Sequence, residues 1–223
     1  MADRTDGKPV FKVLNIKMLS FLVLISVFIS CLFLYLVGSV PTGYWFAKYF
    51  FNIDITGHGS GNIGASNIGR VLGKKYFVFV FLIDFLKAFI SLYIVALFIL
   101  VMVPFSCGFC CVQKIFFLNF LALLFGNAYS IFLNFKGGKG VATTAGILAW
   151  AFPFKFFMIF CCLWLLVLAI FRKPFLASLL TAYFACFIYY FVFFDFANIY
   201  PFYFLIFVCI WLTFRHRSNF KRI

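Results

Sequence analysis

The sequence predicts an all-α integral membrane protein with about seven transmembrane helices and glycine-rich cytoplasmic loops. Of its 223 residues, 66% are hydrophobic and only 11% are charged, whereas soluble domains average roughly 25% charged residues. The apolar residues form blocks without any charge, such as 19–37, 88–103 and 175–194. These blocks approach the ~20 residues that a helix needs to cross a bilayer. They do not alternate between apolar and polar residues as barrel strands do, so helices are expected.

Seven apolar segments define the expected membrane spans. They lie at about residues 19–39, 76–105, 115–135, 141–152, 156–171, 175–194 and 200–214, and the fourth and the last are short. The first segment is longer than a signal-peptide core and precedes no convincing cleavage site, so we expect a mature helix. No repeat, linker or soluble domain interrupts the pattern. The sequence therefore predicts a single polytopic membrane domain over residues 1–223.

Basic residues in the loops predict the orientation. One side would carry twelve of them: Lys48, Arg70, Lys74, Lys75, Lys136, Lys139, Arg172, Lys173, Arg215, Arg217, Lys221 and Arg222. The loops of the other side carry only Lys114 and Lys155, although the N-terminal tail adds Arg4, Lys8, Lys12 and Lys17 there. Because twelve residues against two in the loops outweigh four at one end, we expect the first side to face the cytoplasm.

The formal net charge of +14 does not indicate a nucleic-acid partner. The basic residues lie in short loops between spans, where they would meet lipid headgroups and anionic substrates. No basic stripe on a soluble domain is present to receive a duplex. The chain has no Glu and only five Asp, so chemistry that depends on carboxylates is severely restricted.

A cluster of cysteines raises the question of a metal site. Cys107, Cys110 and Cys111 form a Cys-x-x-Cys-Cys pattern, but no His or second pair lies nearby. Zinc sites combine two such elements. We therefore interpret these cysteines as structural thiols and predict no metal.

Residues 57–70 form the first glycine-rich segment, which reads GHGSGNIGASNIGR. It contains a G-x-G-x-x-G pattern, but no strand precedes it, and the context excludes a dinucleotide fold. Consecutive glycine amides can still converge on an anion. Ser60, Asn62 and Ser66 add neutral polar groups, and Arg70 could bind a phosphate through two hydrogen bonds. We interpret the segment as a functional loop rather than as a flexible surface loop.

The second glycine-rich segment, residues 135–144, reads FKGGKGVATT. A Walker A loop would place Ser or Thr after the Gly-Lys pair, where this chain has Gly140. Gly137 and Gly138 nevertheless free the backbone to surround an anion, and Lys139 supplies a point charge. A helix that begins near residue 141 would direct its first amides towards the same place. A phosphate site is favoured over a basic interfacial turn.

Two further groups are open to structural and functional interpretations. Residues 215–222 could be a basic tail on anionic headgroups, yet His216 and Asn219 would share one face of a continued helix. Asp84 and Lys87 lie three residues apart in an apolar segment, where ionisable groups usually face the interior of a bundle. This pair could be structural or belong to the site.

In their order along the chain, these stretches resemble the bacterial acyl-phosphate-dependent glycerol-3-phosphate acyltransferase family, often called PlsY. The matching parts are 38–43, 59–67 with Arg70, Asp84 with Lys87, 135–143, and 215–222. Where that family usually has Gly-His-x-Phe-Pro, this chain has Gly126-Asn127-Ala128-Tyr129-Ser130. Ser66 stands where Thr is common.

The resemblance implies seven membrane helices in a bacterial inner membrane, with an outward N-terminus and active loops in the cytoplasm. It implies transfer of a fatty acyl group from acyl phosphate to the 1-hydroxyl of glycerol 3-phosphate, giving lysophosphatidic acid and phosphate. By motif position it makes Ser60, Lys139 and His216 catalytic. It assigns substrate binding to Arg70, Asn219, Gly61, Asn62, Gly64, Ser66, Gly137, Gly138 and Ser178. The expected partners are the two substrates and the bilayer, without a cofactor or an obligate protein partner.

The expected mechanism is a single displacement. Acyl phosphate is already activated, so positioning and charge stabilisation suffice without an enzyme nucleophile. The departing phosphate and His216 are the candidate proton acceptors. A His-x4-Asp pair, common in acyltransferases that use acyl-CoA, is absent because Ile63 and Lys221 stand at that spacing. The alternative function is a small transporter or channel for a phosphate-bearing anion, against which spans without midplane charge argue.

Overall fold

The computed structural model describes residues 10–103, 108–195 and 198–220, and within these ranges every regular element is a helix. The elements are α1 (Val10–Ser39), α2 (Thr42–Phe51), η1 (Ile55–Gly57), α3 (Ala65–Val71), α4 (Lys74–Met102), α5 (Gly108–Ala128), η3 (Ile131–Leu133), α6 (Val141–Ala151), α7 (Phe154–Phe171), α8 (Pro174–Ile188), η4 (Tyr189–Phe193), α9 (Tyr200–Arg215) and α10 (Arg217–Phe220). Most are α-helices; η1 and η3 are 3₁₀ turns, and η4 is a π-helical turn that continues α8.

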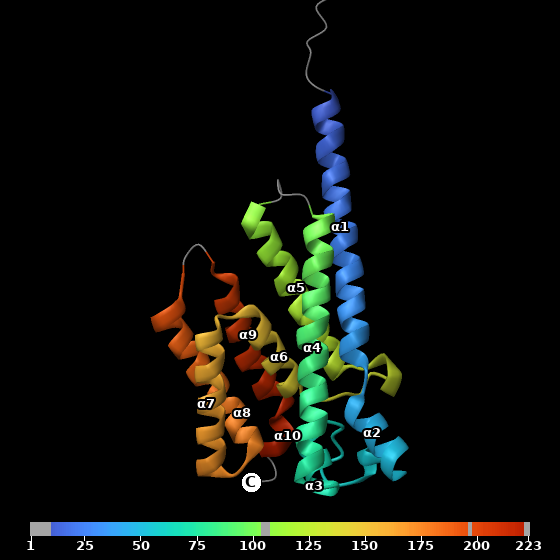
Figure 1. Cartoon of the computed structure of the whole chain (residues 1–223), viewed down its shortest axis with the longest axis vertical. Helices are drawn as coiled ribbons and strands as arrows, with labels where there is room; N and C mark the ends of the chain where they lie inside the picture. Colours follow the sequence, from blue (N-terminus) through green and yellow to red (C-terminus); the bar gives the residue numbers. More distant parts are fainter. Residues whose placement is uncertain (1–9, 104–107, 196–197, 221–223) are drawn as a thin grey trace, which may run out of the picture.

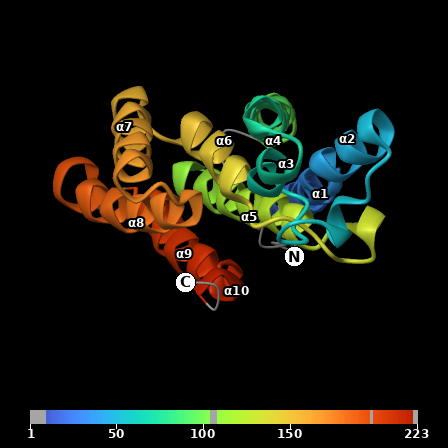
Figure 2. The same cartoon turned by 90° about the horizontal axis from the view of Figure 1, so that it is seen from below.

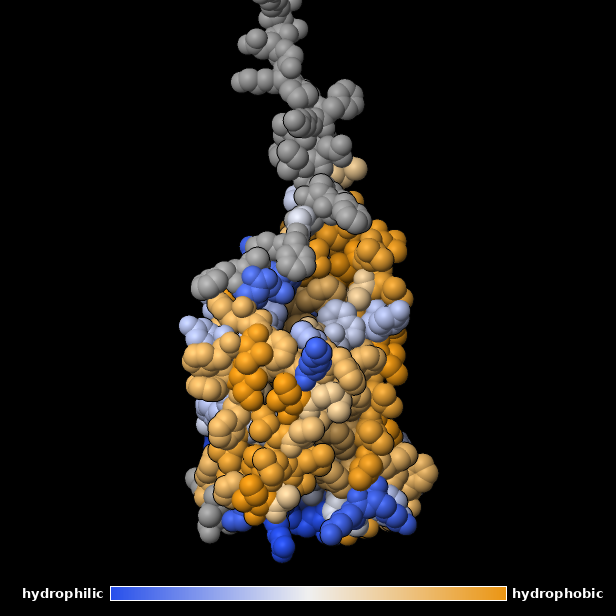
Figure 3. Space-filling model, turned by 60° about the vertical axis from the view of Figure 1, so that its left-hand side comes forward, coloured by the Kyte–Doolittle hydropathy of each residue, from blue (hydrophilic) through white to orange (hydrophobic). Residues whose placement is uncertain are grey.

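The long helices run roughly alongside one another, and their connections gather at two ends (Figure 1). The segments 40–73, 129–140, 172–173 and 216–220 lie together at the lower end of the bundle (Figures 1 and 2). An apolar surface covers most of the height, while hydrophilic residues collect at that lower end (Figure 3). The polar loops from distant parts of the sequence are therefore placed on one side of an apolar bundle.

Among the described residues, five helical segments are long and apolar enough to cross a membrane. They are Ser20–Phe51, Lys74–Met102, Cys111–Leu133, Phe154–Phe171 and Pro174–Phe193. The helices Val141–Ala151 and Tyr200–Arg215 are apolar but shorter, at the positions where the sequence predicts short spans. The all-helical membrane fold is thus confirmed, whereas seven crossings stay a prediction.

The structure differs from the expected boundaries in several places. The first helix begins at Val10 instead of residue 19, and the third apolar segment forms a helix over Gly108–Ala128 instead of 115–135. The short helices α2 and α3 were not expected, because they lie in the connection between the first two predicted spans. Cys111 is disulfide-bonded, so its interpretation as a thiol is wrong; sequence spacing alone does not reveal the redox state. Cys107 and the side chain of Cys110 lie outside the described residues.

Glycines allow the helices of the core to approach closely. A Cβ atom on Gly38 of α1 would lie 2.3 Å from the Leu123 carbonyl oxygen of α5, and one on Gly126 would lie 2.2 Å from the Tyr35 oxygen. Gly146 of α6 meets the backbone of α4 in the same way, at 2.5 Å from the Phe85 oxygen. Small residues commonly permit such contacts between membrane helices. These contacts fix α1 on α5 and α4 on α6, which together carry both glycine-rich loops.

Candidate functional site

A cavity of about 540 Å³ opens among the segments at the polar end of the bundle. Ten of the twelve residues that the sequence assigns to the site line it: Ser60, Asn62, Gly64, Ser66, Arg70, Gly138, Lys139, Ser178, His216 and Asn219. Gly61 and Gly137 are not among the lining residues. The cavity therefore brings together four regions of the chain that are far apart in sequence.

The cavity carries an excess of positive charge. Arg70, Lys139, Arg172 and Lys173 line it, whereas Asp84 is the one carboxylate among its lining residues. Asp84 itself pairs with Lys87. A pocket with this balance of charge attracts anions such as phosphates.

The first glycine-rich loop is held in shape by two of its asparagines. The Asn67 side chain, 1% exposed, accepts the Ser60 amide at 2.8 Å and donates to the His58 oxygen at 2.9 Å. The Asn62 side chain accepts the Gly64 amide at 2.8 Å. Asn67 and Asn62 thus stabilise the loop itself, and the loop carries Ser60 on the cavity wall.

The second glycine-rich loop is fixed from both sides. The Gly138 amide donates to the backbone carbonyl oxygen of Asn127 on α5 at 2.9 Å. Arg215 Nη2 donates to the Gly138 carbonyl oxygen at 2.6 Å. A Cβ atom on Gly137 would lie 2.3 Å from the Asn127 oxygen. Gly137 therefore serves the close packing of the loop on α5. Its role in direct substrate binding stays a prediction.

Helix α6 starts directly after this loop. Gly140 is its N-terminal cap with a φ of 83°, and the first helical hydrogen bond runs from the Thr144 amide to the Gly140 oxygen. Val141 and Ala142 precede that bond and line the cavity. Amides at a helix start lack partners within the helix, and they favour an anion. Lys139 and the start of α6 thus lie on the same wall.

Lys139 meets the C-terminal segment across the cavity. Its Nζ donates to Asn219 Oδ1 at 2.6 Å. The bond joins the second loop to α10, 80 residues further along the chain. Sequence reasoning expected both residues in the site, and the structure places them in contact.

His216 is a buried, neutral group on the cavity wall. It is 3% exposed, and its Nδ1 lies 2.8 Å from the Leu212 oxygen. Since a carbonyl can only accept, Nδ1 carries the proton and Nε2 is left as the acceptor. Burial, with a smaller contribution from the charges of Lys139 and Arg215, lowers the pKa of His216 to about 4, although the hydrogen bond to Leu212 opposes the shift. His216 can therefore accept a hydrogen bond near neutral pH but holds a proton weakly.

Ser178 lies on the deeper wall, where α7 faces α8. Its hydroxyl donates to the Pro174 oxygen at 2.9 Å and accepts from the Trp164 indole at 3.3 Å. Trp164, Phe77, Phe81 and Phe175 also line the cavity, so its lining combines cationic and apolar side chains.

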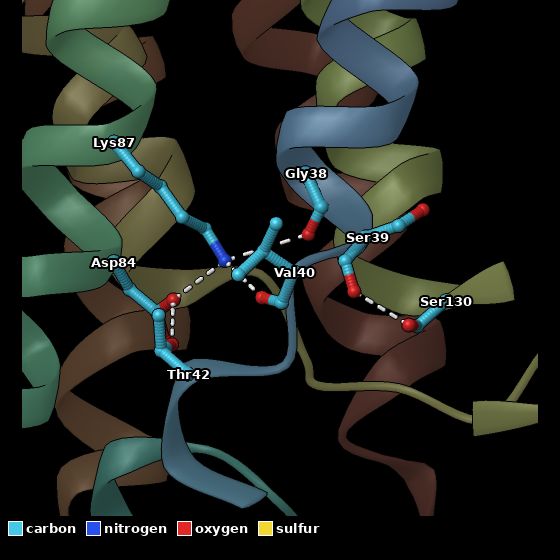
Figure 4. A network of polar contacts seen from close by, with 7 residues as sticks. All are labelled: Gly38, Ser39, Val40, Thr42, Asp84, Lys87 and Ser130. Atoms are coloured by element: carbon cyan, nitrogen blue, oxygen red, sulfur yellow. Dashed lines mark hydrogen bonds and ion pairs between the residues drawn. The ribbon is translucent and has the colours of Figure 1, made fainter. Parts of the chain in front are cut away.

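The break between α1 and α2 forms another part of the wall (Figure 4). Thr42 and Asp84 line the cavity. Thr42 Oγ1 donates to Asp84 Oδ1 at 2.5 Å, and Lys87 Nζ lies 2.7 Å from the same oxygen. Within the described residues, no group of three His, Cys, Asp or Glu side chains could hold a metal.

The sequence matches a known family over most of its length. A model of the glycerol-3-phosphate acyltransferase family matches residues 28–223. The chain belongs to this family. A glycerol-3-phosphate acyltransferase of Fusobacterium nucleatum is 35% identical over 189 residues, which cover 85% of this chain and 90% of that protein. The resemblance noted from the motifs is thus confirmed.

Two solved structures of this family share the fold. Both are crystal structures of PlsY, described as an integral membrane glycerol 3-phosphate acyltransferase, in its glycerol 3-phosphate and lysophosphatidic acid forms. Their TM-scores are 0.73 and 0.71, with 32% identity, covering 88% of this chain and 91% of each PlsY chain. The present chain is accordingly a multi-pass integral membrane protein.

Sequence reasoning did not select several residues that shape this cavity. Arg172, Lys173 and Trp164 line it although they come from the α7–α8 region, which carries no glycine-rich motif. Arg215 had been noted only for its charge. A charged pair in a tight turn between two spans is the signal that could have found Arg172 and Lys173, because such a turn must lie at the same end as the loops.

Proposed function

We propose that the protein transfers a fatty acyl group from acyl phosphate to the 1-hydroxyl of glycerol 3-phosphate, forming lysophosphatidic acid and phosphate. The observation that carries the proposal is the cavity, whose lining combines cationic and apolar side chains. One substrate is a small polar anion, and the other combines a phosphate with a hydrocarbon chain. Membership of the glycerol-3-phosphate acyltransferase family supports the same acceptor.

The two kinds of lining side chain suggest which residues contact each substrate. Arg70, Lys139 and Asn219 would hold the phosphate of glycerol 3-phosphate, and Ser60 would contact the same substrate. The apolar residues Phe77, Phe81, Trp164 and Phe175 would contact the acyl chain. Gly64 and Ser66 of the first loop and Ser178 would lie near the acyl phosphate group. In this arrangement the acceptor hydroxyl meets the activated carbonyl at the polar end of the cavity.

The reaction proposed is one displacement. The hydroxyl oxygen attacks the acyl carbonyl carbon, a new ester bond forms, and the bond from that carbon to the phosphate oxygen breaks. Lys139 and the first amides of α6 would stabilise the charge that develops. No covalent enzyme intermediate is needed, since the acyl group arrives activated.

The hydroxyl proton goes to the departing phosphate in this mechanism. His216 has a pKa of about 4, which makes it a poor base near neutral pH. Its Nε2 can instead accept a hydrogen bond from the acceptor hydroxyl and orient it. Of the two proton acceptors that the sequence left open, the electrostatics of His216 favour the phosphate.

The proposed placement in the cell has the polar end facing the cytoplasm of a bacterium, with seven helices crossing the inner membrane. Arg70, Lys139, Arg172 and Arg215 all belong to that end. Lys114 and Lys155 lie near the opposite ends of α5 and α7. Basic residues concentrate in cytoplasmic loops.

The donor is the part of the proposal to test first. Purified protein in detergent is given labelled glycerol 3-phosphate with either palmitoyl phosphate or palmitoyl-CoA. We expect lysophosphatidic acid and phosphate in equal amounts from the acyl phosphate, and no product from the CoA ester. Product from the CoA ester alone would contradict the donor, while uptake of glycerol 3-phosphate into protein-containing vesicles without any product would favour the transporter.

A further inference from the structure

An ion pair lies inside the bundle at the break between α1 and α2 (Figure 4). Lys87 Nζ and Asp84 Oδ1 are 2.7 Å apart, and the two side chains are 11% and 10% exposed. A buried ion pair gains little net stability, because both charges lose their hydration. The partners of each charge therefore indicate what the pair does.

Lys87 supports the end of α1. Its Nζ donates to the Val40 oxygen at 2.8 Å and to the Gly38 oxygen at 3.4 Å. In a continued helix the Gly38 oxygen would accept the Thr42 amide, but here that amide donates to the Val40 oxygen. Pro41 ends α1 because it has no N–H to donate. Lys87 thus replaces hydrogen bonds that the break removes.

Asp84 supports the start of α2. Its Oδ1 accepts the hydroxyl of Thr42, the first residue of that helix, at 2.5 Å. The same oxygen pairs with Lys87. Lys87 therefore bonds to the chain before Pro41, and Asp84 bonds to it after Pro41. The ion pair joins the two side chains.

The segment held in this way touches the first glycine-rich loop and Ser130, whose oxygen accepts the amide of Phe135 at the start of the second. A Cβ atom on Gly43 would lie 2.1 Å from the Ile63 oxygen, so α2 packs directly on the first loop. On its other side, the Ser39 oxygen accepts the Ser130 hydroxyl at 2.5 Å (Figure 4). Ser130 begins the turn that leads to Lys139. A shift of the break would consequently displace both walls of the cavity.

We propose that Asp84 and Lys87 are positioning residues for the acyl transfer. They fix the break between α1 and α2, and the break sets the two glycine-rich loops at the separation that the two substrates require. The proposal rests on the function proposed above. It assigns the pair neither to substrate contact nor to stability alone.

The test compares single and double replacements of the pair. Asp84→Asn and Lys87→Met each leave one buried charge without its counterion, whereas Asp84→Leu with Lys87→Met removes both charges and all their contacts. Ser91→Ala is the control, because Ser91 is also buried on α4 but bonds only to the Ala88 oxygen of its own helix. For each protein, KM for both substrates, kcat and the thermal unfolding temperature are measured in one detergent.

Removing one partner of a buried pair destabilises a protein, while replacing both is often tolerated. We therefore expect both single variants to unfold at lower temperature and the double variant to recover most of that loss. Activity should not recover: kcat/KM stays at least tenfold low in the double variant, with KM raised for both substrates, while Ser91→Ala matches the wild type.

Three results would overturn the proposal. A double variant with wild-type kcat/KM would show that the pair serves stability alone. A change in KM for only one substrate would show that the break does not govern both loops. A wild-type protein that acylates no glycerol 3-phosphate would contradict the proposed function as well, and only that outcome affects both.

Discussion

Lys139 and Asn219 are joined by a 2.6 Å hydrogen bond from the ammonium group to the amide oxygen. The bond connects the start of α6 to the C-terminal segment, and both residues line the cavity. A flexible Lys side chain is costly to order, so an amide partner holds its charge where a phosphate would bind without neutralising it. Arg70, Arg172 and Lys173 line the same cavity and add to its positive charge.

Replacing Asn219 tests that choice. Asn219→Ala should lower kcat/KM by about 10- to 100-fold, the usual range for losing a hydrogen bond to a charged group. Asn219→Asp should raise KM for glycerol 3-phosphate further, because a carboxylate would neutralise Lys139 and repel the phosphate. Initial rates across a series of glycerol 3-phosphate concentrations measure both. An Asp variant with wild-type KM would contradict the assignment.

Titration of His216 should not affect the pH dependence of kcat/KM near neutral pH. Its pKa is lowered to about 4, below the ordinary ~6.5, so it takes up a proton only as the pH falls well below 6. The ratio of kcat/KM between the wild type and His216→Gln should therefore be constant from about pH 6 to 8, and titration of the substrate cancels in this ratio. A ratio that rises with pH through about 6.5 would show that His216 acts as the base.

Gly137 should be intolerant of a side chain. A Cβ atom there would meet the Asn127 oxygen at 2.3 Å and the Ala128 oxygen at 2.6 Å. Gly137→Ala should lower the free energy of unfolding by about 1–3 kcal/mol, as overpacking does, and reduce activity. Gly57→Ala is the control, since nothing lies within 4 Å of its Cβ position. Denaturation in detergent measures both variants, and equal stabilities would refute the packing role.

Arg215 should not be replaceable by Lys. Its guanidinium donates to the Gly138 oxygen at 2.6 Å and lies 5.3 Å from the centre of the Tyr129 ring. Lys lacks the planar group that makes both contacts. We expect Arg215→Lys to lower kcat/KM by about tenfold, in the range of one lost hydrogen bond. Arg217→Lys, at an exposed position that does not line the cavity, should keep normal rates.

Much of the site could be predicted from the sequence, because its polar loops stand out in an apolar chain. Ser60, Arg70, Lys139, His216 and Asn219 were all expected to lie together, and all line the cavity. The internal roles of the loop residues could not be predicted. Asn67 and Gly137 look like candidate ligands in a sequence, but Asn67 bonds to the backbone of its own loop and Gly137 packs against the backbone of α5. Helix α2 was also not predicted, since it lies in the connection between the first two predicted spans.

The central claim is that Lys139 serves acyl transfer to glycerol 3-phosphate in this cavity. The most direct measurement is lysophosphatidic acid formation from acyl phosphate and glycerol 3-phosphate by wild type, Lys139→Ala and Lys136→Ala. Lys136 lies in the same loop but does not line the cavity. The account predicts a loss of at least about 100-fold for Lys139→Ala, as for other preorganised donors, and near-normal rates for Lys136→Ala. Full activity in Lys139→Ala, or an inactive wild type, would contradict it.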